Sequence, residues 1–379
     1  MSKPNNKKTE QEAQFYATDE VKTNEAEIDA PQKMDNMVIG RGAIIYSISD
    51  ANDKMREWNP ETAESEQLPR DIVASLIEDE NNKKSIAGLA DEYHNLCSEY
   101  ARKRLPALAL KVAILGTKRY PQNVDLLADV IRFGGESVKW DACKKAYERL
   151  QGIPKQMWNW RAFTFTIDYL KARYSTEQEA EKETTYKAAL ELAEAYKQSN
   201  LCDERAWVAD AELKLIKNQI AEAIDTLEDG IKTVAVAPQC CLKLADLYLE
   251  QGKYEKVIHY AAIGATVTAQ EQPSTSIGYL YYISGLAKDA LIHKEALEKP
   301  DDAQAGFRNL ARVQGALSDY DIAETLFRAE KRVAYLGTIW MRETILKKKS
   351  GIEEQTNGED SKIEKALLER LLMQKQGNH

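Results

Sequence analysis

The strongest constraint on this chain is a pattern that occurs twice between Trp207 and Gly264, shifted by 34 residues. In each copy, small or apolar residues recur at helical spacing, a polar corner follows, and a second helical run ends on glycine. The matching positions are Trp207, Ala211, Leu215, Ala223, Leu227 and Gly230 in the first copy and Cys241, Ala245, Leu249, Val257, Ala261 and Gly264 in the second. A helix pair of this kind is apolar on more than one face, so it must stack on a neighbour to bury its core.

A helix-turn-helix unit with this period, and with small residues at the two closest approaches, resembles the tetratricopeptide repeat (TPR) family. Gly252 supplies the tight corner of the second copy. The stretches 105–121 and 142–154 resemble the second helix of further units. The resemblance implies an all-α fold, an α-solenoid of TPR-like helix-turn-helix repeats. Two matching copies leave an irregular helical bundle open as the alternative.

The chain divides into three predicted parts. Residues 1–69 are expected to form a largely disordered or extended tail, because polar and charged residues dominate, and 50–69 are acidic and interrupted by proline, which is typical of a linker. Residues 70–350 carry the helical pattern of the solenoid. Residues 351–379 are predicted to be an acidic linker and a C-terminal amphipathic helix. That helix either caps the open end of the solenoid, which we favour, or lies in another protein's groove.

A short apolar segment at 37–48 stands out within the predicted tail. Its β-branched residues suit an extended conformation, which could dock on a partner's sheet edge or back onto the solenoid. Gly40 and Gly42 suggest a nucleotide-binding loop. We set that interpretation aside because the third glycine is missing and no Lys-Ser or Lys-Thr follows.

Two stretches depart from the regular period. The polar block Ser175–Thr185 is expected to be an insertion or a helix extension, and the helix through Tyr279 is expected to continue to Leu297. A second helix holding Phe307 is expected after it. Trp158 and Trp160 cannot both face the same side of a helix, so one is expected in the core and the other is a candidate contact residue.

Charge and cysteine content limit the class of protein. The formal net charge is −9, which argues against direct binding of nucleic acid or anionic membrane and favours a basic partner. Five cysteines without a C-x-x-C pair or a visible signal peptide favour reduced thiols and a cytoplasmic location. Cys240 and Cys241 could form a redox switch, but small helix-face hydrophobes are the commoner case. No run reaches the roughly 18 apolar residues of a membrane span.

No catalytic motif is present. None of the four histidines belongs to an H-E-x-x-H motif, and neither a G-x-S-x-G motif nor a P-loop occurs. The sequence therefore predicts a protein that is not an enzyme and that uses no metal and no cofactor. A catalytic site assembled from distant residues would leave no such motif.

The resemblance also implies where a partner would bind. In the TPR family the first helices of the units line a concave surface, and ligand contacts come from fixed places on them. Carried onto this chain, those places are Arg205, Val208, Glu212, Leu215 and Ile216 in one unit and Leu242, Lys243, Asp246, Leu249 and Glu250 in the next. Most are aliphatic or acidic, unlike the lysine and asparagine with which some family members clamp a terminal carboxylate. We therefore expect an amphipathic helix or a basic segment as the partner, with Glu212, Asp246 and Glu250 setting the charge preference.

The predicted function is a non-catalytic scaffold or adaptor that holds a protein or peptide partner in the groove of the helical array, within a multiprotein complex. A peptide-responsive regulator is one alternative. An accessory subunit of an enzymatic or RNA-processing complex is another, although the acidic balance counts against direct contact with RNA.

Overall fold

The structure, a computed structural model, describes residues 45–63, 66–82, 88–266, 274–298, 306–330, 332 and 335–352. The regular elements in these ranges are helices, which confirms the predicted all-α class. The α-helices are α2 (Ile48–Glu57), α3 (Gln67–Asn81), α4 (Ala90–Arg102), α5 (Pro106–Arg119), α6 (Val124–Glu136), α7 (Trp140–Gln151), α8 (Trp160–Thr176), α9 (Glu179–Ser199), α10 (Glu204–Ile216), α11 (Ile220–Thr233), α12 (Pro238–Glu250), α13 (Tyr254–Ala265), α14 (Ser274–Glu298), α15 (Leu310–Ala329) and α16 (Leu336–Ser350). Two 3₁₀ turns are η2 (Lys155–Met157) and η4 (Gly306–Arg308).

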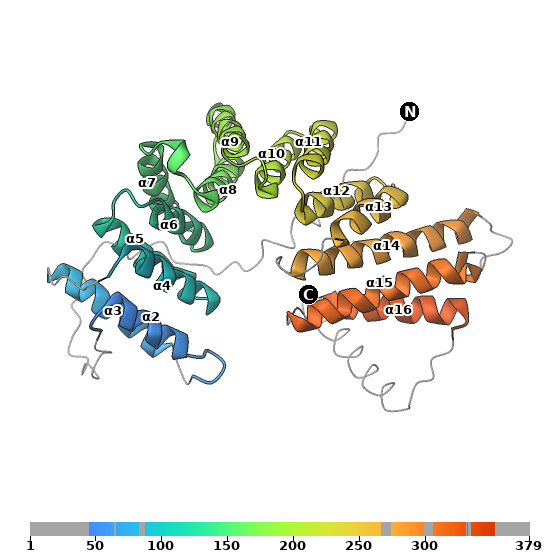
Figure 1. Ribbon diagram of the computed structural model, residues 1–379, viewed down its shortest axis with the longest axis horizontal. Helices are drawn as coiled ribbons and strands as arrows, with labels where there is room; N and C mark the ends of the chain where they lie inside the picture. The colour runs from blue at the N-terminus through green and yellow to red at the C-terminus, as the bar shows by residue number, and fades with distance from the viewer. Residues whose placement is uncertain are drawn as a thin grey trace. The chain divides into compact units, whose positions relative to one another are not determined.

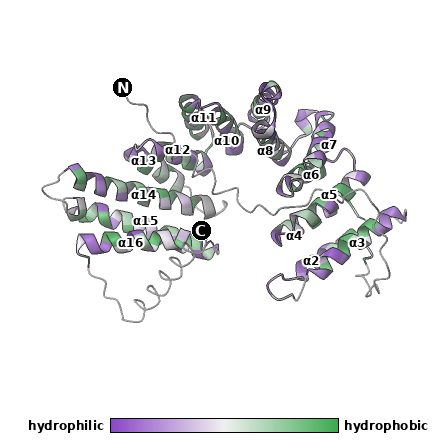
Figure 2. Ribbon diagram, turned by 180° about the vertical axis from the view of Figure 1, so that it is seen from behind, coloured by the Kyte–Doolittle hydropathy of each residue, from purple (hydrophilic) through white to green (hydrophobic). Residues whose placement is uncertain are grey.

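The helices follow one another as stacked pairs (Figure 1). We call the first members of the pairs, α4, α6, α8, α10, α12 and α14, the A-helices, and the second members, α5, α7, α9, α11 and α13, the B-helices. Each A-helix contacts the next one along the chain, while α5, α9, α11 and α13 contact the A-helix that follows them. Hydrophobic and hydrophilic residues are mixed within the helices (Figure 2), as expected for helices that bury one side and expose the other. The predicted stacking of helix pairs is therefore confirmed.

One type of corner joins α4 to α5, α6 to α7, α10 to α11 and α12 to α13. Three residues join the two helices, and the middle one has left-handed backbone geometry. The N–H of the residue after it donates to the carbonyl five positions earlier, which closes the helix end. The left-handed residues are Arg104 (φ 59°), Val138 (φ 56°), Asn218 (φ 58°) and Gly252 (φ 66°). The closing bonds are Leu105 to Tyr100 at 2.9 Å, Lys139 to Gly134 at 2.7 Å, Gln219 to Lys214 at 3.0 Å and Lys253 to Tyr248 at 2.9 Å. The corner predicted at Gly252 is thus a recurring device, with Asn218 at the equivalent position 34 residues earlier.

The repeated pattern places its small residues where helices approach most closely. A Cβ on Gly230 would lie 2.9 Å from the Cβ of Trp207, and a Cβ on Gly264 would lie 2.6 Å from a methyl carbon of Leu280. Both distances are shorter than real Cβ contacts, so each position accepts only glycine without rearrangement. The 34-residue frame predicted from the sequence is therefore the packing frame of α10 to α13.

The pair α8 and α9 departs from this frame. Its helices have 17 and 21 residues, and extended backbone at Glu177 and Gln178 joins them in place of the left-handed corner. The block 175–185 therefore ends α8 and begins α9, which confirms the predicted helix extension. The long helix predicted through Tyr279 is also confirmed as α14, which has 25 residues.

One prediction after α14 is wrong. Phe307 lies in the short turn η4, and the next helix begins only at Leu310. The reason is local, because the Asn309 side chain accepts a hydrogen bond from the Arg312 N–H and so caps α15 at that point. Phe307 instead packs into the core between α14, α15 and α16.

The linker predicted at 50–69 is also wrong, because α2 and the start of α3 lie in it. Ile48, Ala51 and Met55 recur at helical spacing and are fully buried, with α2 packed on α4. The Ser47 hydroxyl caps the helix. Average composition concealed this short apolar stripe among charged residues. Within the described residues, helical stacking therefore begins at Ile48, not at residue 70.

The rest of the predicted tail, including the apolar segment at 37–44, and the C-terminal helix after 352 lie outside the described residues. Cys240 and Cys241 are both buried, and burial raises the pKa of each thiol. Such thiols are poor nucleophiles, which favours packing residues over a redox switch.

Candidate interaction surface

The ten residues predicted to contact a partner lie on two neighbouring A-helices, α10 and α12, which pack against each other. Asp246 and Glu250 are exposed, and the other eight are half-buried. The half-buried aliphatic residues Val208, Leu215, Leu242 and Leu249 pack partly against the core, so they offer only their edges to a partner.

A chain of ion pairs joins three A-helices through Glu212. Its carboxylate lies 2.6 Å from the Lys171 ammonium on α8 and 2.8 Å from the Lys243 ammonium on α12. Partial burial raises the pKa of this carboxyl, but the two lysines outweigh that effect and hold the pKa below its ordinary value. Glu212 and Lys243 therefore connect helices, and their charges are largely neutralised before any partner arrives.

The same kind of contact joins the A-helices nearer the N-terminus. The His94 Nδ1 on α4 lies 2.6 Å from an Asp129 carboxylate oxygen on α6, and an Arg161 guanidinium nitrogen on α8 lies 2.5 Å from the His94 Nε2. Because guanidinium can only donate, we assign Nε2 as the acceptor and place the proton on Nδ1. The Asn159 amide nitrogen also donates to Asp125 at 2.6 Å. Polar contacts thus run from one A-helix to the next along this face, from α4 to α12.

Two acidic residues of the predicted set take no part in the contacts between A-helices described above. Among the residues that the structure describes, Asp246 and Glu250 have no ion-pair partner within 4.0 Å. Partial desolvation by the surrounding protein raises the pKa of Asp246 to about 6; Lys243 lowers it and the charge of Glu250 raises it. Unlike Glu212, these carboxylates are available to a partner.

The two tryptophans singled out in the sequence lie at the start of α8 and just before it. Trp158 is buried, with its Nε1–H donating to the Ile153 carbonyl, whereas Trp160 is 37% exposed. This confirms that one tryptophan lies in the core and the other on the surface. The Arg205 guanidinium carbon lies 3.9 Å from the centre of the Trp160 ring, a cation–π contact that joins α8 to the predicted residues on α10.

A pocket of about 330 Å³ adjoins these aromatics between α6, α7 and α8. Trp140, which is 40% exposed, lines it together with Phe165 and Tyr169. The Arg132 guanidinium carbon lies 5.4 Å from the centre of the Phe165 ring. The i, i+4 spacing of Phe165 and Tyr169 on an A-helix is the sequence signal that could have found this pocket.

No helix in the described ranges is both long enough and apolar enough to cross a bilayer. Nor do three or more histidine, cysteine or acidic side chains gather there as a metal site would require.

No family model and no curated protein matches the chain. Solved structures do match it. A tetratricopeptide repeat protein from Parabacteroides merdae is 14% identical with a TM-score of 0.45, over 79% of this chain and 98% of that one. A thermophilic TPR protein of Thermus thermophilus, TTC0263, is 13% identical with a TM-score of 0.42, over 54% of this chain and 99% of that one. The Cut9–Hcn1 structure is 13% identical with a TM-score of 0.34, over 79% of this chain and 61% of that one.

The fold of this chain is a TPR-like helical repeat. Its helix pairs stack on one another, and its left-handed corners recur 34 residues apart, as in such repeats. In this TPR-like fold the A-helices bring the predicted residues of α10 and α12 together, and they add Trp160 on α8 beside them.

Proposed function

We propose that this chain is a non-catalytic scaffold that binds a partner protein or peptide on the A-helix face formed by α8, α10 and α12. The observation that carries the proposal is the contrast among the acids of this face. Glu212 is neutralised by two lysines, whereas Asp246 and Glu250 are exposed and lack an ion pair within the described ranges. Unpaired carboxylates beside half-exposed aliphatic side chains favour a ligand of matching chemistry.

The chemistry of the face favours a basic amphipathic helix or a basic peptide segment. Its aliphatic side would contact the exposed edges of Val208, Ile216 and Leu242, and its lysines or arginines would meet Asp246 and Glu250. Tryptophan and arginine are favoured anchors in protein interfaces. The stacked Trp160 and Arg205 side chains extend the face accordingly.

A scaffold without catalysis suits the titratable groups of this face. Both ring nitrogens of His94 are already engaged, by Asp129 and Arg161, so this histidine has no free nitrogen with which to accept a substrate proton. We place the protein in the cytoplasm, where its free cysteines would stay reduced.

Selection from a peptide library tests the proposal. The full chain would be used to select from a display library of random peptides of about 20 residues, and we expect basic, aliphatic-rich sequences to be enriched. The double variant Asp246→Lys with Glu250→Lys should bind a selected peptide at least about tenfold more weakly, as expected when close charge pairs turn repulsive.

The matched control is Glu222→Lys with Asp225→Lys, which makes the same change of charge at exposed positions of the B-helix α11. It should bind the peptide as the unmodified chain does. If both double variants lose affinity equally, the loss comes from the change of net charge and not from this face. If the α12 variant binds as tightly as the unmodified chain, the face is not the binding site.

A further inference from the structure

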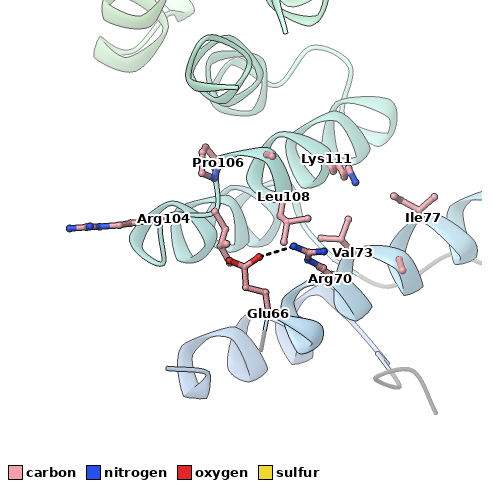
Figure 3. Close-up of a pocket in the computed structure, with 11 residues that line it drawn as sticks. Glu66, Arg70, Val73, Ile77, Arg104, Pro106, Leu108 and Lys111 are labelled. Carbon is pink, nitrogen blue, oxygen red and sulfur yellow. Dashed lines mark hydrogen bonds and ion pairs between the residues drawn. The ribbon is translucent and has the colours of Figure 1, made fainter. Parts of the chain in front are cut away.

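A second candidate surface lies between α3 and α5 (Figure 3). It is a groove of about 460 Å³. Val73 and Ile77 of α3 and Leu108 of α5 form its apolar lining. Ala74 and Ala107 are exposed at its edges, and such small side chains would let a third helix approach the two helices closely.

The border of this groove is positively charged. Arg104 and Lys111 are exposed, and neither has an ion-pair partner in the part of the chain that the structure describes. Arg70 also lines the groove, but its guanidinium is held by the Glu66 carboxylate at 3.1 Å (Figure 3).

The start of α5 adds to this positive potential. Its N-cap residue, Leu105, makes no side-chain capping bond, and the first turn contains no acidic residue. The N-terminus of α5 therefore contributes a partial positive charge at the groove, and no carboxylate in the first turn of α5 offsets it.

We propose that this groove binds an acidic amphipathic helix of a partner protein. The apolar side of that helix would cover Val73, Ile77 and Leu108, and its carboxylates would meet Arg104, Lys111 and the start of α5. A basic helix, as proposed for the α12 acids, would be repelled here. The chain then presents two surfaces of opposite preference, which lets one scaffold hold two chemically different partners. This inference is independent of the proposed function, because it uses none of the A-helix residues.

A pair of synthetic peptides tests it on the full chain. The first is a fluorescently labelled peptide of about 18 residues, with leucine at helical spacing and glutamate on the remaining face. Its twin carries lysine in place of each glutamate. We expect saturable binding of the glutamate peptide, measured by fluorescence anisotropy, and weaker binding as salt is raised.

Three variants locate the binding. Arg104→Glu with Lys111→Glu should weaken the glutamate peptide at least about tenfold and should favour the lysine twin. Ala74→Trp should block both peptides by filling the groove without changing its charge. Lys144→Glu with Lys145→Glu makes the same change of charge at exposed positions of α7 and should bind as the unmodified chain does.

Other outcomes overturn the proposal. Binding that both groove variants retain would place the acidic peptide elsewhere, and an absence of saturable binding would reject the site. If the unmodified chain is a dimer and Arg104→Glu with Lys111→Glu makes it a monomer in size-exclusion chromatography, the groove holds a second copy of the chain instead. Circular dichroism of each variant separates loss of binding from loss of folding.

Discussion

The pairs α10–α11 and α12–α13 are two copies of one packing unit with different exposed faces. Both have a left-handed corner, at Asn218 and at Gly252, and both have a glycine at the closest helix approach, at Gly230 and at Gly264. Their charged residues differ. Glu212 on α10 is held by two lysines, whereas Asp246 on α12 is unpaired among the described residues.

This difference distinguishes the buried residues that hold the helix pairs together from the exposed residues that can contact a partner. Buried positions repeat because each pair must fit against its neighbour, and a larger side chain at the contact forces a shift. Exposed charges carry no such constraint. They can serve stacking in one copy and remain free in the next. We therefore expect substitutions in the shared frame to change stability alike in both copies, and substitutions of the exposed acids to have different effects.

The largest effect is expected at the two glycines. Gly230→Val and Gly264→Val should each lower the free energy of unfolding by about 3 kcal/mol, because the new side chain would overlap Trp207 or Leu280. The control is Gly135→Val on α6, where nothing lies within 4 Å of a Cβ, and it should change stability by less than about 0.5 kcal/mol. Urea unfolding of the three variants measures this. Tolerance at one of the two glycines would break the equivalence of the copies.

A smaller effect is expected from the paired acid of α10. Glu212→Gln should lower the free energy of unfolding by roughly 1 to 2 kcal/mol, because Lys171 and Lys243 lose their shared carboxylate while partly buried. Asp246→Asn should not lower it, because the raised pKa of Asp246 means that the folded chain disfavours the charge that this substitution removes. Urea denaturation of both variants measures this, provided that the unfolding free energy falls with urea concentration at the same slope in each. Similar losses in both variants would mean that Asp246 is also structural.

Substitutions at the left-handed corner residues should change the free energy of unfolding by about 1 kcal/mol. Val138 is β-branched and has a φ of 56°, a conformation that costs such residues about 1 to 2 kcal/mol. Val138→Gly should therefore stabilise the chain by about 1 kcal/mol, and Gly252→Val should destabilise it by a similar amount. Thermal unfolding measures both. A loss of stability in Val138→Gly would show that this side chain contributes more through packing than its backbone strain costs.

The smallest effect concerns pH. Because the pKa of Asp246 is raised to about 6, its carboxylate is charged at pH 7.5 and mostly protonated at pH 5.0. Binding of a selected basic peptide should therefore weaken about threefold over that range, in line with the energy of one exposed charge pair. Asp246→Asn should bind at both pH values about as weakly as the unmodified chain does at pH 5.0, because its side chain is neutral throughout. Isothermal titration calorimetry at the two pH values tests this, and an unchanged pH response in Asp246→Asn would assign the effect to another group.

The sequence predicted the parts of the fold that repeat. Buried small residues and the Gly252 corner recur at a fixed offset, so the pattern predicted the paired helices of α10 to α13. It did not predict α2, whose three buried apolar residues lie in a charged stretch. Contacts between A-helices, such as that of Lys171 with Glu212 or of Arg205 with Trp160, depend on how the pairs stack. Spacing along the chain does not reveal such contacts, and it did not reveal the groove between α3 and α5 either.

Photo-cross-linking of a selected basic peptide to the full chain would show directly which helices the peptide contacts. A benzophenone group placed in turn along the peptide would react with protein within a few ångströms, and mass spectrometry would identify the linked segments. We expect cross-links to α8, α10 and α12. Cross-links confined to the B-helices α11 and α13 would contradict it.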